Sequence, residues 1–290
     1  MKKIFYFILI SLFSLTVFSC AKKSDSSSSS SDNSSSTTSS SSSSGFVAVG
    51  ASGTLLTSPD AITWTSRTSG TSKNINNVAY GNSKFIAVGD NGTTLSSSDG
   101  ITWTDWTSSC GANDNESLWD VAYGSSTWVA VGDNGSIYTS DESSCTKRTS
   151  GTTVDFNELI YGDSTFVAAG DNGTVLTSSD GITWTSRTSG TTNNLYGGAY
   201  YNYGGYRGIT LVGASGKTLY FSDNYTSLTA WAAPSMTTNL FGFVRGGSTW
   251  STWVYVGSSG TIYTSADTDT DVTARTSGTT EHLRRVFYKE

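Results

Sequence analysis

Residues 177–192 read TSSDGITWTSRTSGTT, and residues 57–72 read TSPDAITWTSRTSGTS, nearly the same words 120 positions earlier. Related words stand between these two copies and after them. Self-similarity at a fixed spacing is the signature of a repeat architecture. The repeating unit therefore decides the fold, and it has to be defined before any single motif is interpreted.

A strand-like word marks each unit. It reads FVAVG at 46, FIAVG at 85, WVAVG at 128, FVAAG at 166, ITLVG at 209 and WVYVG at 253, at spacings of 38 to 44 residues. Each copy is followed by a small-residue turn such as Asn91-Gly92 and then by a second β-rich word. Asn, Ser and Gly tolerate positive φ, so this order predicts a hairpin.

A third strand is expected in the segment that follows the Trp of the quoted stretch. A fourth word completes the unit: INNVAYG (75–81), LWDVAYG (118–124), FNELIYG (156–162), LYGGAYY (195–201), LFGFVRG (240–246) and LRRVFY (283–288). Six copies of four strands predict an all-β, six-bladed propeller of four-stranded antiparallel blades over residues 46–290. The first unit lacks this word before FVAVG, and its last copy stands at 283–288. We expect this C-terminal strand to pair with the N-terminal blade and close the ring, which removes exposed strand edges.

The quoted stretch contains a shorter motif, in which Ser-x-Asp precedes a Trp four residues after the Asp. The pairs are Asp60 with Trp64, Asp99 with Trp103, and Asp180 with Trp184. The motif resembles the Asp-box (BNR-like) repeat of bacterial propellers, and residues 46–290 resemble photosystem II assembly-factor-like repeat propellers. In a tight turn Asp and Ser satisfy backbone donors while Trp packs across the turn, so we expect these residues to be structural. Asp90, Asp133 and Asp171 have the pattern of turn residues, and we expect no metal site and no cofactor.

The first 45 residues do not fit the repeat. Lys2 and Lys3 precede the apolar run 4–18, which ends at Val17-Phe18-Ser19-Cys20. This resembles a bacterial lipoprotein signal, which implies cleavage before Cys20 and attachment of acyl chains such as palmitate to Cys20. The alternative is an ordinary secretory signal. We therefore divide the chain into a signal peptide (1–19), a lipidated cysteine with a Ser-rich tether (20–45) and the propeller (46–290), anchored in the bacterial cell envelope at the outer membrane or cell surface.

Charge narrows the range of partners. The chain has 17 basic and 23 acidic residues. An acidic surface argues against nucleic acid as a partner, because binding to phosphates depends on Lys and Arg. We expect a monomer.

The Asp-box resemblance also suggests a sialidase-like glycoside hydrolase with its site in the axial funnel. Arg67, Arg148, Arg187 and Arg275 occupy equivalent places at the rim of four repeats, whereas a catalytic site needs unlike residues that converge. His282 is the only histidine, so a His-based triad or a zinc site lacks parts. We therefore expect no enzyme, with the carbohydrate-active enzyme as the alternative.

The fourth word contains a variable pair of residues that we place near the axis. Its candidate ligand-binding residues are Asn77, Asp120, Glu158, Arg284 and Arg285. The alternative is that these side chains pack between blades. On the first interpretation the protein is a membrane-anchored binding or scaffold propeller for a protein or glycan, although one fold hosts many functions.

Cys110 and Cys145 are the only cysteines besides Cys20. An exported protein favours a disulfide between them. Ideal blades would place them at opposite ends of neighbouring sheets, too far apart to be bridged. Both outcomes remain open from the sequence.

Overall fold

The computed structural model describes eleven stretches of the chain. They are residues 17–22, 46–59, 62–107, 116–141, 144–203, 206–221, 225–231, 236–246, 252–266, 272–280 and 282–283. Asp60, Cys110, Arg284 and Arg285 lie outside these stretches, as do the remaining residues of the expected closing strand after Leu283.

Twenty-four strands in the described stretches form six antiparallel four-stranded sheets. Sheet 1 contains β1 (Val17–Lys22), β2 (Phe46–Gly50), β3 (Leu55–Ser58) and β4 (Thr65–Ser66). Sheet 2 contains β5 (Ile75–Gly81), β6 (Lys84–Gly89), β7 (Thr94–Ser97) and β8 (Thr104–Asp105). Sheet 3 contains β9 (Leu118–Gly124), β10 (Thr127–Gly132), β11 (Ile137–Ser140) and β12 (Cys145–Arg148). Sheet 4 contains β13 (Phe156–Gly162), β14 (Thr165–Gly170), β15 (Val175–Ser178) and β16 (Thr185–Arg187). Sheet 5 contains β17 (Leu195–Tyr203), β18 (Tyr206–Gly213), β19 (Thr218–Phe221) and β20 (Leu228–Trp231). Sheet 6 contains β21 (Leu240–Gly246), β22 (Thr252–Gly257), β23 (Ile262–Ala266) and β24 (Val272–Arg275).

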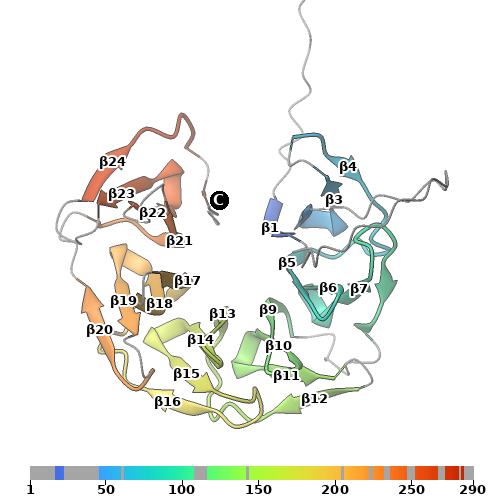
Figure 1. Cartoon of the computed structure of the whole chain (residues 1–290), viewed down its shortest axis with the longest axis horizontal. Helices are drawn as coiled ribbons and strands as arrows, with labels where there is room; N and C mark the ends of the chain where they lie inside the picture. Colours follow the sequence, from blue (N-terminus) through green and yellow to red (C-terminus); the bar gives the residue numbers. More distant parts are fainter. Residues whose placement is uncertain are drawn as a thin grey trace, which may run out of the picture.

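The sheets are arranged around a common axis as the blades of a propeller (Figure 1). The first strand of each sheet lies nearest the axis and the fourth lies at the rim. Each inner strand packs on the inner strand of the next sheet, from β1 on β5 to β17 on β21. The all-β propeller of six four-stranded blades expected from the repeats is confirmed.

One turn recurs between the second and third strands of every sheet. It is a single 3-10 turn: η1 (Ala51–Gly53), η2 (Asp90–Gly92), η3 (Asp133–Gly135), η4 (Asp171–Gly173), η5 (Ala214–Gly216) and η6 (Ser258–Gly260). Its middle residue has positive φ, for example +53° at Asn91 and +54° at Ser259. Asn and Ser tolerate this conformation better than most residues, which explains why the sequence repeats Asn-Gly and Ser-Gly at this point.

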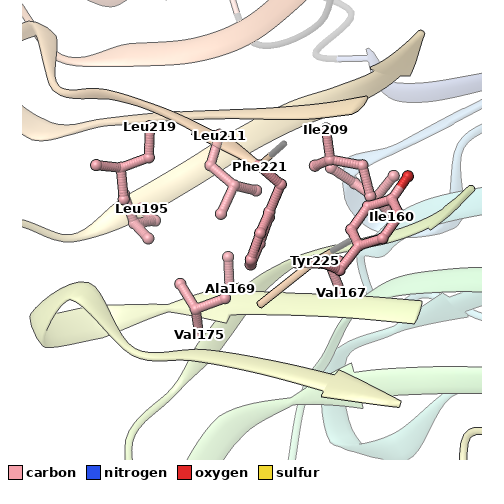
Figure 2. Packing of buried hydrophobic residues seen from close by; sticks show 10 residues of the cluster. All are labelled: Ile160, Val167, Ala169, Val175, Leu195, Ile209, Leu211, Leu219, Phe221 and Tyr225. Carbon is pink, nitrogen blue, oxygen red and sulfur yellow. The ribbon is translucent and has the colours of Figure 1, made fainter. Parts of the chain in front are cut away.

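The core lies between neighbouring sheets, because each strand alternates its apolar side chains between two faces. Between sheets 4 and 5, Val167, Ala169 and Val175 meet Leu211 and Phe221, as Figure 2 shows. Equivalent clusters fill the other four interfaces from sheet 1 to sheet 6. Each blade is therefore stabilised by the blades that flank it.

The Tyr-Gly ending of the inner-strand word joins neighbouring blades. A Cβ on Gly124 would lie 2.3 Å from the ring of Tyr161 in the next sheet. A Cβ on Gly162 would lie 2.2 Å from the ring of Tyr200. No side chain fits between these groups, so glycine is required for the tyrosine of the next blade to pack here.

The Asp boxes have the geometry expected of a structural turn. In the box of β15, Asp180 Oδ1 accepts hydrogen bonds from Ser178 Oγ (2.9 Å) and from the backbone N–H groups of Ile182 (2.8 Å) and Thr183 (2.9 Å). The indole N–H of Trp184 donates to the carbonyl of Gly181 at 2.9 Å. The box of Asp99 and Trp103 has the same contacts. Trp64 is 37% exposed.

Asp180→Ala is expected to lower the free energy of unfolding by about 1 kcal/mol at pH 7, as loss of a capping side chain does. The N–H groups of Thr183 and Ile182 hold the pKa of Asp180 below its ordinary value of 3.8. The stabilisation is therefore complete above the ordinary pKa and is lost as the pH falls through the lower folded-state pKa. Urea denaturation at pH 7, 4 and 3 measures the free energy of unfolding of the variant and of the wild type. The difference between the two should shrink below about pH 4, and a difference that does not change with pH would contradict this account.

The inner strand of sheet 1 differs from the expectation. Val17–Lys22 (β1) pairs with Phe46–Gly50 (β2), in the place expected for residues 283–288. Residues 17–19, assigned to the signal peptide from the sequence, thus pair with β2 in this structure, and the boundary between signal peptide, tether and propeller stays a prediction. The physical reason is that this segment is extended and meets β2 in the register of the other inner strands, with Val17 opposite Gly50 as Ile75 is opposite Gly89.

Cys145, at the start of β12, is disulfide-bonded. Cys20 lies in β1, at the inner edge of sheet 1, whereas Cys145 lies in the rim strand of sheet 3. Cys110 lies outside the described residues, so its pairing with Cys145 stays a prediction.

Candidate binding face

All six inner strands contain a β-bulge after their first residue. In β5 the register shifts between Ile75 and Asn77, so Asn76 is the extra residue. The extra residues of the six strands, here called the bulge residues, are Phe18, Asn76, Trp119, Asn157, Tyr196 and Phe241. A bulge bends the strand and re-aims the side chain of the extra residue, and such irregularities are frequent at functional sites.

Three of the bulge residues are hydrogen-bonded to the recurrent turns. The side-chain amides of Asn76 and Asn157 donate to Asp90 Oδ1 (3.1 Å) and Asp171 Oδ1 (2.9 Å). The indole N–H of Trp119 donates to Asp133 Oδ1 at 2.6 Å. Because the turns occupy the same place in every blade, the bulge residues gather on one face of the ring. We call it the bulge face.

Aromatic rings dominate one part of the bulge face. The ring of Tyr196 lies 5.5 Å from that of Phe241, which lies 5.7 Å from the ring of His282. Trp119, on another blade, is 39% exposed, and its hydrogen bond to Asp133 fixes its indole. Rigid, partly exposed aromatic side chains are effective anchors for a binding partner, since they bury a large area at a small cost in entropy.

Carboxylate groups occupy the other part of the bulge face. The turns of sheets 2 to 4 carry Asp90, Asp133 and Asp171, whereas those of sheets 5 and 6 carry Ala214 and Ser258 at the same position. The face is thus polarised: carboxylates lie beside the bulge residues of sheets 2 to 4, Trp119 included, and are replaced by Ala214 and Ser258 beside the aromatic bulge residues of sheets 5 and 6. It is electrostatically complementary to a partner with both basic and apolar groups.

Three of the predicted ligand-binding residues are buried between inner strands. Asn77, Asp120 and Glu158 follow the bulge residues and are 5%, 2% and 2% exposed. The Asn77 amide donates to Asp120 Oδ1. The other carboxylate oxygen of Asp120 accepts from the backbone N–H of Leu159 at 2.8 Å. Asp120 therefore links sheets 2, 3 and 4.

The residue at the same position in later blades also contributes to the contact between neighbouring blades. A Cβ on Gly197 would lie 2.1 Å from the carbonyl oxygen of Phe241, so only glycine allows sheets 5 and 6 to approach. The solvent-accessible candidates are one residue earlier, where Trp119 is exposed and Tyr196 and Phe241 are half-buried. The sequence-based interpretation missed them, although a signal was available: they are the aromatic members of the variable pairs.

The rim arginines have one role per blade. Arg67 Nε donates to Thr57 Oγ1 at 2.9 Å. Arg148, Arg187 and Arg275 make the same bond to the hydroxyls of Thr139, Thr177 and Thr264 at 2.7–2.8 Å. These guanidinium groups join the two outer strands of their own blades and do not converge on one point.

Other site types have little support in the described stretches. Within them, no cluster of three or more His, Cys, Asp or Glu residues could hold a metal ion, and no helix is long and apolar enough to cross a membrane. Grooves of about 680 Å³ occur beside the turns η4 and η6, lined by the equivalent segments 186–193 and 274–280. Because both blades contain the same groove, it is a property of the repeat.

The fold and the face together define a class: an Asp-box-bearing, repeat-built β-propeller with an irregular ring of side chains on one face. The chain is similar to a structure described as YCF48 bound to D1 peptide, with a TM-score of 0.68 and 15% identity over 94% of this chain and 87% of that chain. It is also similar to YCF48 from Cyanidioschyzon merolae, with a TM-score of 0.65 and 14% identity over 93% and 87%. No protein-family model and no curated protein matches the chain. At this level of identity the likeness shows the propeller fold alone.

Proposed function

We propose that this protein is a non-enzymatic lipoprotein of the bacterial cell envelope, anchored through Cys20, whose bulge face binds an extended segment of a protein partner. The observation that carries the proposal is the set of partly exposed, hydrogen-bonded or stacked side chains on that face. A similar propeller has been described in complex with a peptide, which supports a protein partner over a glycan. The expected location is the outer membrane or cell surface.

The chemistry of the bulge face favours a particular kind of segment. Trp119, Tyr196 and Phe241 can hold apolar or aromatic side chains, and the carboxylates of Asp90 and Asp133 attract basic groups. An extended peptide presents alternate side chains to opposite sides, so it can reach several bulge residues as it crosses the face. The partner segment is therefore one that combines basic and aromatic residues. Such recognition needs no reacting group.

The arrangement of acidic residues argues against the hydrolase alternative. Asp120 is 2% exposed and bound to strands of three sheets, and Glu158 is 2% exposed. A glycosidase needs two carboxylates that face a common substrate. The rim arginines are hydrogen-bonded within their own blades, away from the axis.

The binding proposal is tested with full-length protein and two sets of variants. Envelope proteins retained by immobilised wild-type protein are compared with those retained by Trp119→Ala and by Tyr196→Ala/Phe241→Ala. The control is Ile182→Ala, which removes a 48% exposed side chain in an Asp-box turn. We expect at least a tenfold loss of affinity for the captured protein with either bulge-face variant, since an aromatic anchor contributes about 2 kcal/mol or more. Retention equal to the control would overturn the assignment of the face.

Cys20→Ser is expected to release the protein from the membrane. Without the thiol no acyl chain can be attached, and stable anchoring requires more than one such chain. Phase partition in a detergent that separates on warming is the measurement: wild type should enter the detergent phase and the variant the aqueous phase. A variant that stays in the detergent phase would contradict lipid anchoring.

A further inference from the structure

The bulge residues of sheets 2, 3 and 4 form one continuous part of the bulge face. Their inner strands lie side by side, with β9 between β5 and β13 (Figure 1). The side-chain amide of Asn76 donates a hydrogen bond to the carbonyl oxygen of Leu118, the residue before Trp119, at 3.0 Å. Asn157 makes the same contact with the blade that follows it, at the carbonyl oxygen of Leu195 (3.1 Å). Trp119 is therefore flanked by an asparagine from each neighbouring blade.

The hydrogen bonds of the two asparagines leave only the amide oxygen of each uncommitted. A side-chain NH2 group has two N–H donors. In Asn76 these donors are used by Asp90 Oδ1 and by the carbonyl of the next blade, and in Asn157 by Asp171 Oδ1 and by the equivalent carbonyl. All four partners are acceptors, so the nitrogen of each amide must face them and the orientation of the amide is fixed. Neither amide oxygen accepts a hydrogen bond from the described residues, and neither is sealed from solvent.

Trp119 has no uncommitted donor either. Its single N–H group donates to Asp133 Oδ1 at 2.6 Å, and its indole is 39% exposed. Within the described stretches, the carboxylates of Asp90, Asp133 and Asp171 form no ion pair with Lys, Arg or His. Lys73, beside sheet 2, donates to a turn carbonyl at 3.5 Å and not to these carboxylates. The three bulge side chains thus offer a partner two hydrogen-bond acceptors and an aromatic surface, next to uncompensated negative charge.

On the basis of the proposed function, we propose that Trp119 and the amide oxygens of Asn76 and Asn157 bind an arginine side chain of the partner segment. The planar guanidinium stacks on the indole, and its N–H groups, which lie in the same plane, donate to the oxygens on either side. The carboxylates of the turns attract its charge. A lysine ammonium has the charge but neither the plane nor the fixed fork of donors. The two asparagines therefore determine specificity for arginine.

The test is a titration of ¹⁵N-labelled full-length protein with N-acetyl-argininamide, followed by NMR. N-acetyl-lysinamide keeps the charge without the planar fork, and N-acetyl-citrullinamide keeps a planar group with N–H donors without the charge. The indole N–H signal of Trp119 is assigned by its absence from the spectrum of Trp119→Phe. We expect this signal and the side-chain amide signals of Asn76 and Asn157 to shift together and to saturate. N-acetyl-argininamide should bind at least about fivefold more tightly than either analogue.

Equal binding of either analogue, or the absence of a saturable shift, overturns the proposal. Asn157→Ala removes one acceptor and should weaken the binding of N-acetyl-argininamide at least about fivefold. The control Ile182→Ala, in an Asp-box turn, should bind it like wild type. Asn157→Ala also leaves Asp171 without its donor, so Trp119→Leu, at a 39% exposed position, covers the case in which that variant does not fold. The leucine variant should bind the arginine and lysine amides equally, and wild-type affinity for N-acetyl-argininamide in either folded variant overturns the proposal.

Failure of this proposal is distinguishable from failure of the proposed function. If Trp119→Ala loses the captured envelope protein but the three amides bind wild type equally, only the arginine assignment is refuted. If Trp119→Ala and Tyr196→Ala/Phe241→Ala both retain the captured protein as the control does, the binding face itself is refuted.

Discussion

Phe166→Ala is expected to lower the free energy of unfolding by about 3–5 kcal/mol, the usual effect of truncating a fully buried Phe. Phe166 is 0% exposed and lies between sheets 3 and 4, with its ring 4.6 Å from that of Tyr161 and 6.5 Å from that of Trp184. The variant therefore loses the transferred apolar area, leaves a cavity between two blades and removes the support of an Asp-box tryptophan. Domains of this kind are usually stable by about 5–15 kcal/mol, so the loss is a large part of the total.

Guanidinium denaturation followed by tryptophan fluorescence measures this effect as a shift of the midpoint at constant slope. Ile182→Ala is the control, because Ile182 is 48% exposed and its truncation should change the stability by less than about 0.5 kcal/mol. Similar midpoints for the two variants would mean that the interface between sheets 3 and 4 is not packed as described.

Asp120→Ala is expected to cost about 3–5 kcal/mol, comparable to the Phe166 truncation although no apolar core is removed. The carboxylate is 2% exposed and accepts from Asn77 and from the N–H groups of Val121 and Leu159, both at 2.8 Å. Alanine leaves these buried donors without an acceptor, and each such donor costs about 1–3 kcal/mol. Asp120→Asn keeps one carbonyl acceptor and should therefore fall between alanine and wild type.

The matched control is Asp163→Asn, which removes a carboxylate that forms a 2.9 Å ion pair with the half-exposed Arg207. Surface pairs of this kind contribute about 0–1 kcal/mol. Chemical denaturation of the three variants at pH 7 should rank Asp120→Ala as least stable, then Asp120→Asn, then Asp163→Asn. If Asp120→Ala were as stable as Asp163→Asn, the buried link between the three inner strands would be refuted.

Features that depend on residues close together in the chain are predictable from the sequence. The repeated Asn-Gly and Ser-Gly pairs imply positive φ in the turns, and Asn91 has φ of +53°. The Ser-x-Asp motif implies a turn closed on its own backbone, and Asp180 accepts from residues two and three positions later. Each of these interactions spans only a few residues, so the local sequence contains all its partners, and six copies of one unit then leave little choice of architecture.

Features that depend on strand register and on residues distant in the chain are visible only in the folded protein. Whether Trp119 or Asp120 faces the solvent is set by a one-residue bulge, and a shift of one residue exchanges the two sides of a strand. Cys145 is disulfide-bonded, and such a bond forms only where the fold brings a second cysteine within reach. The inner edge of sheet 1 is filled by Val17–Lys22, a segment outside the repeat that meets β2 in the register of the other inner strands. The sequence did not predict this pairing, because the two strands are distant in the chain and only the folded protein brings them together.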